Sequence, residues 1–178
     1  MKHLVFFACL VLAFSACFPP DREPSFGGFE FDGTGYRPVY ASAAEVADVK
    51  VGAPQPLLKP GKMYVSDPYL FVNDTGKGIH IINNADPAHP EFESFISIPG
   101  NYDMAVKGQF LYADNYSNLI VFNIRDPEAP TLAKTLPNAI PVQDYPPFSN
   151  IYFECVDKTK GYVIAWEKVS MDKPKCYR

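Results

Sequence analysis

The chain has 178 residues, of which 15% are aromatic and 18 are proline, and its formal net charge at pH 7 is −4. A negative balance without a basic cluster repels polyanions, so nucleic acid is excluded as an expected partner. Frequent tyrosine, phenylalanine and proline favour β-strands separated by firm turns, and a hydrophobic content of 47% excludes a fully disordered chain.

The first residues indicate export. Lys2 precedes an apolar run over residues 4–14, which is too short to span a bilayer as a helix. The run ends in Phe14-Ser15-Ala16-Cys17, which resembles the lipobox of bacterial lipoproteins, with Phe where Leu is commoner. We therefore predict a lipoprotein signal peptide over residues 1–16 and acylation of Cys17. The lipid would anchor the chain to the bacterial cell envelope, with the outer membrane as the expected location. An ordinary secretory signal is the alternative.

Two segments are predicted between the anchor and the folded domain. Residues 17–38 are rich in proline, glycine and charged residues and lack an apolar period, so we expect a flexible lipidated tether. Residues 39–60 are a lead-in that holds the one good helix signal. Ser42 and Glu45 form a capping box, and Gly52 closes the segment, which predicts a helix of two to three turns.

From residue 61 onward the chain repeats itself at a shift of forty. Three blocks align without a gap: residues 70–74 with 110–114, 78–83 with 118–123, and 86–90 with 126–130. Each repeat holds two apolar runs joined by turn-forming residues, as in a β-hairpin, with a further short run on either side. An Asp-Pro-x-x-Pro corner ends the third run, because each proline fixes φ and removes a backbone donor. Four short strands per forty residues is the size of one propeller blade.

The repeats predict an all-β domain over residues 61–178. Its expected units are 61–100, 101–140 and a degraded unit over 141–178. In the last unit, residues 151–156 and 162–166 are expected to pair as another hairpin. We therefore predict an incomplete β-propeller of about three four-stranded blade-like repeats, preceded by a short N-terminal helix.

The strands at residues 79–83 and 119–123, with the Asp-Pro-x-x-Pro corners, resemble the LVIVD-repeat family. Tyr36-Arg37-Pro38-Val39-Tyr40 and residues 113–116 are similar to the bacterial lipoprotein branch of that family. The repeat match covers residues 61–136. The resemblance implies a β-propeller, a cell-envelope location and no catalytic motif. Because closed propellers need at least four blades, we expect an open partial propeller, one completed by a partner, or a shortened paralogue.

Cys155 and Cys176 are the cysteines left once the predicted signal and Cys17 are set aside. In an oxidising compartment a single pair is most simply a disulfide that closes the C-terminal segment. Two separate free thiols are the alternative.

The polar residues predict no metal site, no cofactor and no catalytic residue. His80 lies in a strand and His89 in a proline corner, so a shared metal site or a hydrolytic triad is not expected. Asp74 and Asp114, with neighbouring asparagines, could offer oxygens to Ca²⁺, but their spacing does not match a calcium loop such as the EF-hand. Turn chemistry explains them better.

The best candidates for contact with a ligand are Tyr116, Tyr145 and Phe148. Rings beside proline-stiffened turns present apolar area with little ordering entropy to lose. The alternative is that these rings fold back over a small core, where Trp166 is also expected. We therefore expect a non-enzymatic protein-interaction module directed at another envelope protein, with a glycan-binding accessory protein as the alternative and an enzyme third. Exposed apolar edge strands would favour a protein partner, whereas an aromatic platform would favour a sugar.

Overall fold

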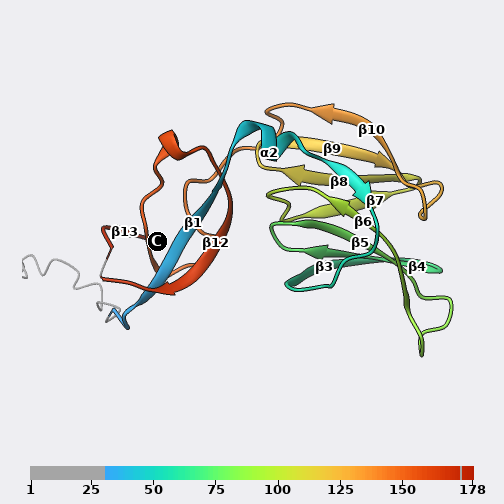
Figure 1. Cartoon of the computed structure of the whole chain (residues 1–178), viewed down its shortest axis with the longest axis horizontal. Helices are drawn as coiled ribbons and strands as arrows, with labels where there is room; N and C mark the ends of the chain where they lie inside the picture. Colours follow the sequence, from blue (N-terminus) through green and yellow to red (C-terminus); the bar gives the residue numbers. More distant parts are fainter. Residues whose placement is uncertain (1–30, 173) are drawn as a thin grey trace, which may run out of the picture. The chain divides into compact units, whose positions relative to one another are not determined.

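The structure is a computed structural model that describes residues 31–172 and 174–178 (Figure 1). Strands dominate this part of the chain and form three separate sheets, none of which closes on itself. The expected all-β character is confirmed. The predicted signal peptide and Cys17 lie outside the described residues.

The first repeat forms a five-stranded sheet, named sheet B. In spatial order its strands are β2 (Lys50–Gly52), β6 (Glu91–Ser97), β5 (Gly78–Asn83), β4 (Tyr69–Asp74) and β3 (Pro60–Ser66). Strands β3 to β6 are consecutive and antiparallel, as the four apolar runs predict, and β2 is added beside β6. Within the described residues, β3 is the other edge of the sheet.

The second repeat forms a four-stranded antiparallel sheet, named sheet C. In spatial order its strands are β10 (Thr131–Leu136), β9 (Asn118–Asn123), β8 (Phe110–Asn115) and β7 (Met104–Lys107). The proline corners join the third and fourth strands of both repeats. In each corner the aspartate starts the turn: Ala88 N donates to Asp86 Oδ1 (3.0 Å) and Glu128 N donates to Asp126 Oδ1 (3.2 Å).

The two repeats differ by one residue in their central hairpin. Three residues separate β4 from β5, whereas two separate β8 from β9. The core-facing residues of β5 are therefore odd-numbered, Ile79 and Ile81, and those of β9 are even-numbered, Ile120 and Phe122. The shift of forty identifies the repeat, but it does not give the side of the sheet on which each residue lies.

The main core is shared by sheets B and C, which Figure 1 shows on the right with sheet C above sheet B. Its buried side chains are Phe71, Ile79, Ile81, Ile96 and Ile98, and then Met104, Leu111, Ala113, Ile120, Phe122 and Ile124. Burial of one large apolar side chain stabilises a fold by about 1.5–3 kcal/mol, so this cluster holds the two sheets together.

The third sheet, named sheet A, differs from the predicted blade. Its spatial order is β12 (Tyr162–Ser170), β1 (Thr34–Ala41), β11 (Tyr152–Phe153) and β13 (Cys176–Tyr177), with the 3₁₀ turn η1 (Lys158–Lys160) between β11 and β12. The prediction that residues 151–156 and 162–166 pair directly as a hairpin is wrong, because β1 lies between β11 and β12. Strand β1 runs antiparallel to β12 and parallel to β11. Residues 34–38, expected in the tether, therefore belong to this sheet.

Sheet A packs against the loop end of the other two sheets. A Cβ placed on Gly76, in the β4–β5 loop, would lie 3.3 Å from the Ala165 side chain and from the Ile164 carbonyl oxygen. A Cβ on Gly100, between sheets B and C, would lie 3.3 Å from the Ile164 side chain. Both glycines have positive φ, so the close approach and the backbone conformation both require glycine.

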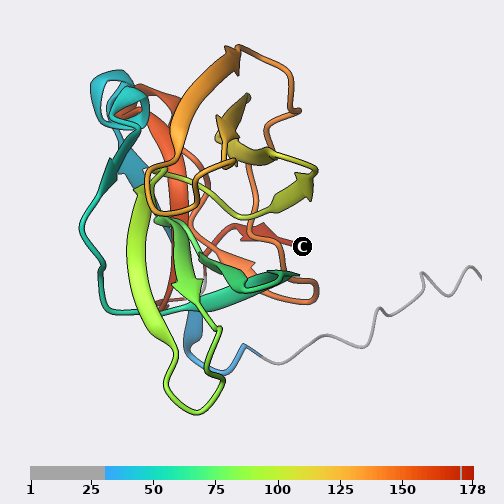
Figure 2. The same cartoon turned by 90° about the vertical axis from the view of Figure 1, so that its right-hand side faces the viewer.

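The predicted capping box is present in α2 (Ala43–Ala47). Glu45 N donates to the Ser42 hydroxyl (3.2 Å), and Ser42 N donates to Glu45 Oε2 (2.7 Å). The helix has five residues, fewer than the predicted two to three turns, and Val46 is its buried side chain. Figure 2 shows the connection from α2 to β3, in teal, running down the left side of the molecule.

Candidate functional site

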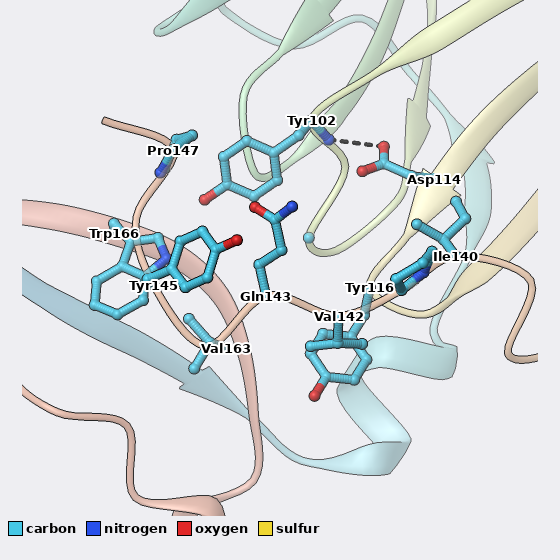
Figure 3. A pocket seen from close by; sticks show the side chains of 12 residues that line it. Tyr102, Asp114, Tyr116, Ile140, Val142, Gln143, Tyr145, Pro147, Val163 and Trp166 are labelled. Carbon is cyan, nitrogen blue, oxygen red and sulfur yellow. Dashed lines mark hydrogen bonds between the residues drawn. The ribbon is translucent and has the colours of Figure 1, made fainter. Parts of the chain in front are cut away.

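A cavity of about 260 Å³ lies where the loop over residues 140–147 passes between sheet C and sheet A (Figure 3). Its lining residues are Gly100, Tyr102, Asp114, Tyr116, Ile140, Pro141, Val142, Gln143, Tyr145, Pro147, Val163 and Trp166. They come from the end of sheet C, from the loop and from β12. The cavity, called the aromatic pocket, combines four rings with one carboxylate.

The rings of the aromatic pocket are held by their neighbours. Tyr116 occupies the two-residue turn between β8 and β9 with φ 57°, a conformation that is uncommon for a bulky residue. Its ring lies edge-on to Tyr162, with centroids 4.8 Å apart. The Arg178 guanidinium lies 4.1 Å from the centre of the Tyr145 ring, and its Nη1 donates to the Pro146 carbonyl (2.7 Å). The Tyr116 and Tyr145 rings are therefore held in place before any ligand binds.

Asp114 is the one carboxylate of the aromatic pocket. Its Oδ1 accepts from Asn101 Nδ2 (2.7 Å) and from the backbone N–H groups of Tyr102 and Asp103 (both 2.8 Å). Its Oδ2 has no hydrogen-bond donor among the described residues. Burial raises the pKa of Asp114, although these donors oppose the shift. Burial, with the nearby Asp114 charge, also raises the pKa of Tyr102 to about 12.

Two cationic side chains near the aromatic pocket already have partners, and one of these partners, Tyr145, is itself a lining ring. Lys158 Nζ lies 2.7 Å from Asp144 Oδ2, and Arg178 is occupied by Tyr145 and Pro146. None of the lining residues is Lys, Arg or His. The lining therefore carries a negative charge and the electron-rich faces of aromatic rings.

The structure places two of the three predicted contact residues in the same cavity, since Tyr116 and Tyr145 both line the aromatic pocket. Phe148 lies outside it, packs on Tyr36 at a centroid distance of 4.9 Å and is 46% exposed. Trp166, expected in the core, is half-buried and lines the pocket. Its pairing with β1 joins residues far apart in the sequence, so no local pattern could have placed it there.

Asp74 and Asp114 accept equivalent backbone hydrogen bonds in the two repeats. Asp74 accepts from the backbone N–H groups of Leu58 and Lys59 (3.1 and 2.9 Å), just before β3. Asp114 accepts from two backbone N–H groups just before β7. Each carboxylate thus holds the residues just before the first strand of its own repeat, β3 or β7. In the described part of the chain, no three His, Cys, Asp or Glu side chains group as metal ligands.

His80 is fully buried on the side of sheet B opposite Ile79 and Ile81. Its Nε2 lies 3.5 Å from Asp74 Oδ2, but neither ring nitrogen makes a hydrogen bond. Phe92 and Phe95 pack on the imidazole, with centroids at 5.6 and 4.6 Å. Burial lowers the pKa of His80 more than Asp74 raises it. His89 is exposed, with Nδ1 2.9 Å from Asp86.

Sheet B has an apolar outer surface on the side facing away from sheet C. Strand pairing places on it Met63, Val65, Leu70, Val72, His80, Ile82, Phe92 and Phe95. Three of these side chains are well exposed, Met63 at 57%, Val65 at 59% and Phe92 at 41%, whereas Val72, His80 and Ile82 are buried. All seven residues of the edge strand β3 are exposed.

Cys155 and Cys176 form a disulfide, which ties β13 to the residues just after β11.

No protein-family model, curated protein or solved structure matches the chain. Within residues 31–172 and 174–178, no helix is long and apolar enough to cross a membrane.

Proposed function

We propose that this chain is a lipid-anchored protein of the bacterial cell envelope, with LVIVD-type repeats, that binds another envelope protein without catalysing a reaction. The anchor is supported by the lipobox-like sequence before Cys17, and the repeat type by the Asp-Pro-x-x-Pro corners. The observation that carries the binding role is the outer surface of sheet B.

Corresponding positions of β5 and β9 pack differently. His80 and Ile82 of β5 lie on the outer surface of sheet B, whereas Ile120 and Phe122, forty residues later in β9, belong to the core. Part of the outer surface of sheet B is therefore built from positions that, one repeat later, form an interface between sheets. This supports an incomplete propeller whose first blade offers a surface for a further β-structure.

The edge of sheet B specifies the kind of partner. Strand β3 has backbone donors and acceptors on its outer side and exposed side chains on both faces. An extended segment of another protein can add to such an edge through main-chain hydrogen bonds, while its side chains cover Met63 and Val65. Burial of apolar area contributes about 25 cal/mol per Å², so these exposed groups add affinity to the strand pairing. We therefore propose that the partner contributes a β-strand.

The test uses the full-length protein in intact envelopes, with a photo-crosslinking amino acid at Val65 of β3. The matched control places the same group at Lys134 of β10, an exposed residue on the edge strand of sheet C. We expect Val65 to link to one discrete envelope protein that Lys134 does not reach, and Val65→Lys to weaken binding of that purified protein. A link only to a second copy of the chain, or equal products at both positions, would overturn the proposed function.

Glycan binding is the second candidate function. It is favoured by the aromatic pocket, because sugars stack on aromatic rings and accept hydrogen bonds from hydroxyl and amide groups. A titration with N-acetylglucosamine, followed by the fluorescence of Trp166, the one tryptophan of the chain, tests it. A saturable change that is lost in Tyr145→Leu would support a glycan.

A further inference from the structure

The aromatic pocket lies at the junction of sheets A and C, apart from the outer surface of sheet B, and its chemistry can be argued independently. We propose that it binds a small organic ammonium ion, with Asp114 as the counter-ion and aromatic rings around the alkyl groups. The four rings belong to Tyr102, Tyr116, Tyr145 and Trp166.

Asp114 has one oxygen fixed and one oxygen available. The three donors to Oδ1 hold the carboxylate in a single orientation. Figure 3 shows the bond from Tyr102 N to this carboxylate, with Gln143 across the cavity from it. The second oxygen can therefore meet a ligand without losing a partner among the described residues. Such an orientation costs no rearrangement when the ligand binds.

Charge discriminates among possible ligands. A half-buried carboxylate has lost part of its hydration, so a ligand cation restores electrostatic stabilisation that a neutral sugar does not supply. An anion would meet Asp114 and ring faces of negative potential, and no Lys, Arg or His lines the pocket, although Arg178 lies over the Tyr145 ring. The pocket therefore favours a cation over a neutral or anionic ligand.

The rings determine the kind of cation. A strongly hydrated metal ion would require several oxygen ligands, whereas the lining is mainly aromatic and aliphatic. Alkylated ammonium groups are recognised by aromatic faces through the attraction between the cation and the ring. The chain already makes this contact within itself, because Arg178 lies over Tyr145 at 4.1 Å. The volume of about 260 Å³ leaves room for a methylated ammonium head with part of its carrier.

The experiment titrates the full-length protein with tetramethylammonium chloride at constant ionic strength and follows Trp166 fluorescence. Sodium chloride and N-acetylglucosamine are titrated in parallel. We expect a saturable change with tetramethylammonium alone. Asp114→Asn, which keeps an acceptor oxygen but removes the charge, is expected to weaken binding at least about tenfold, because a charge-assisted contact is lost. Phe148→Ala, outside the pocket, is expected to leave the affinity unchanged.

Asp74→Asn is the control for the structural role of the carboxylate, because Asp74 holds the residues just before β3 as Asp114 holds those just before β7. It should leave tetramethylammonium affinity unchanged. If Asp114→Asn does not fold, Tyr145→Leu is the second variant, with an expected loss of about 2- to 30-fold from one ring contact. The inference is overturned if tetramethylammonium gives no saturable change, if sodium chloride gives the same change, or if N-acetylglucosamine saturates instead. Equal affinity in wild type and in the folded pocket variant also overturns it.

Discussion

His80 makes the stability of the domain depend on pH in a defined direction. Burial holds the pKa of His80 below its usual 6.5, despite the opposing attraction of Asp74. At a pH between the pKa of His80 in the folded chain and its higher pKa in the unfolded chain, the unfolded chain binds a proton that the folded chain does not. The free energy of unfolding is therefore unaffected by the titration of His80 above about pH 6.5. It falls as the pH is lowered from there through the pKa of His80 in the folded chain. The slope for a single group is at most about 1.4 kcal/mol per pH unit.

The test compares wild type with His80→Leu by urea unfolding at pH 7.5, 6.5 and 5.5, followed by Trp166 fluorescence. Leucine removes both the proton-binding group and two buried nitrogens without hydrogen bonds, so it should raise the free energy of unfolding at pH 7.5 by about 1–3 kcal/mol. It should also remove the loss between pH 6.5 and 5.5. His89→Gln, at an exposed position, should keep the wild-type slope. An equal loss of the free energy of unfolding on acidification in wild type and His80→Leu would show that His80 is not the group responsible.

Three further predictions concern the supports of the fold. Phe71→Ala should lower the free energy of unfolding by about 3–5 kcal/mol in urea unfolding, because Phe71 is fully buried between sheets B and C. Phe148→Ala, at an exposed position, should lower it much less. Similar losses in the two variants would place Phe71 outside the core. Reduction of the Cys155–Cys176 disulfide, which closes a loop with a sequence separation of 21, should cost about 3 kcal/mol, and the doubly substituted Ser variant should show no effect of reductant. Ser42→Ala removes the N-cap of α2 and should cost about 1 kcal/mol by thermal unfolding, with an unchanged melting curve arguing against the capping box.

The order of strands within sheets B and C was predictable because it follows local patterns. Each apolar run of the two repeats became one strand, and the proline corners turned the chain where the lost donors require it. The side of the sheet on which each residue lies was harder to predict. One extra residue in the β4–β5 loop turns each side chain of β5 to the opposite side from its counterpart in β9.

Sheet A could not be predicted from local patterns. Strand β1 pairs with β12 across more than about 120 positions of the chain, and Pro38, which read as part of a tether, lies opposite Trp166. The same long-range pairing explains the partial success at the candidate site. Tyr116 and Tyr145 were identified from their own loops, whereas Trp166 becomes a lining residue only through the position of β12.

The position of β1 between β12 and β11 has a consequence for the order of folding. The hairpins of sheets B and C close over a few residues and can form as soon as they leave the ribosome. Sheet A must wait until the last strands of the chain have been synthesised and have returned to its first strand, which carries the entropic cost of a long loop. The aromatic pocket needs Val163 and Trp166 of β12 for its wall. A nascent or C-terminally clipped chain would therefore be without that wall. Ligand binding would then occur only in molecules in which β1 and β12 have paired.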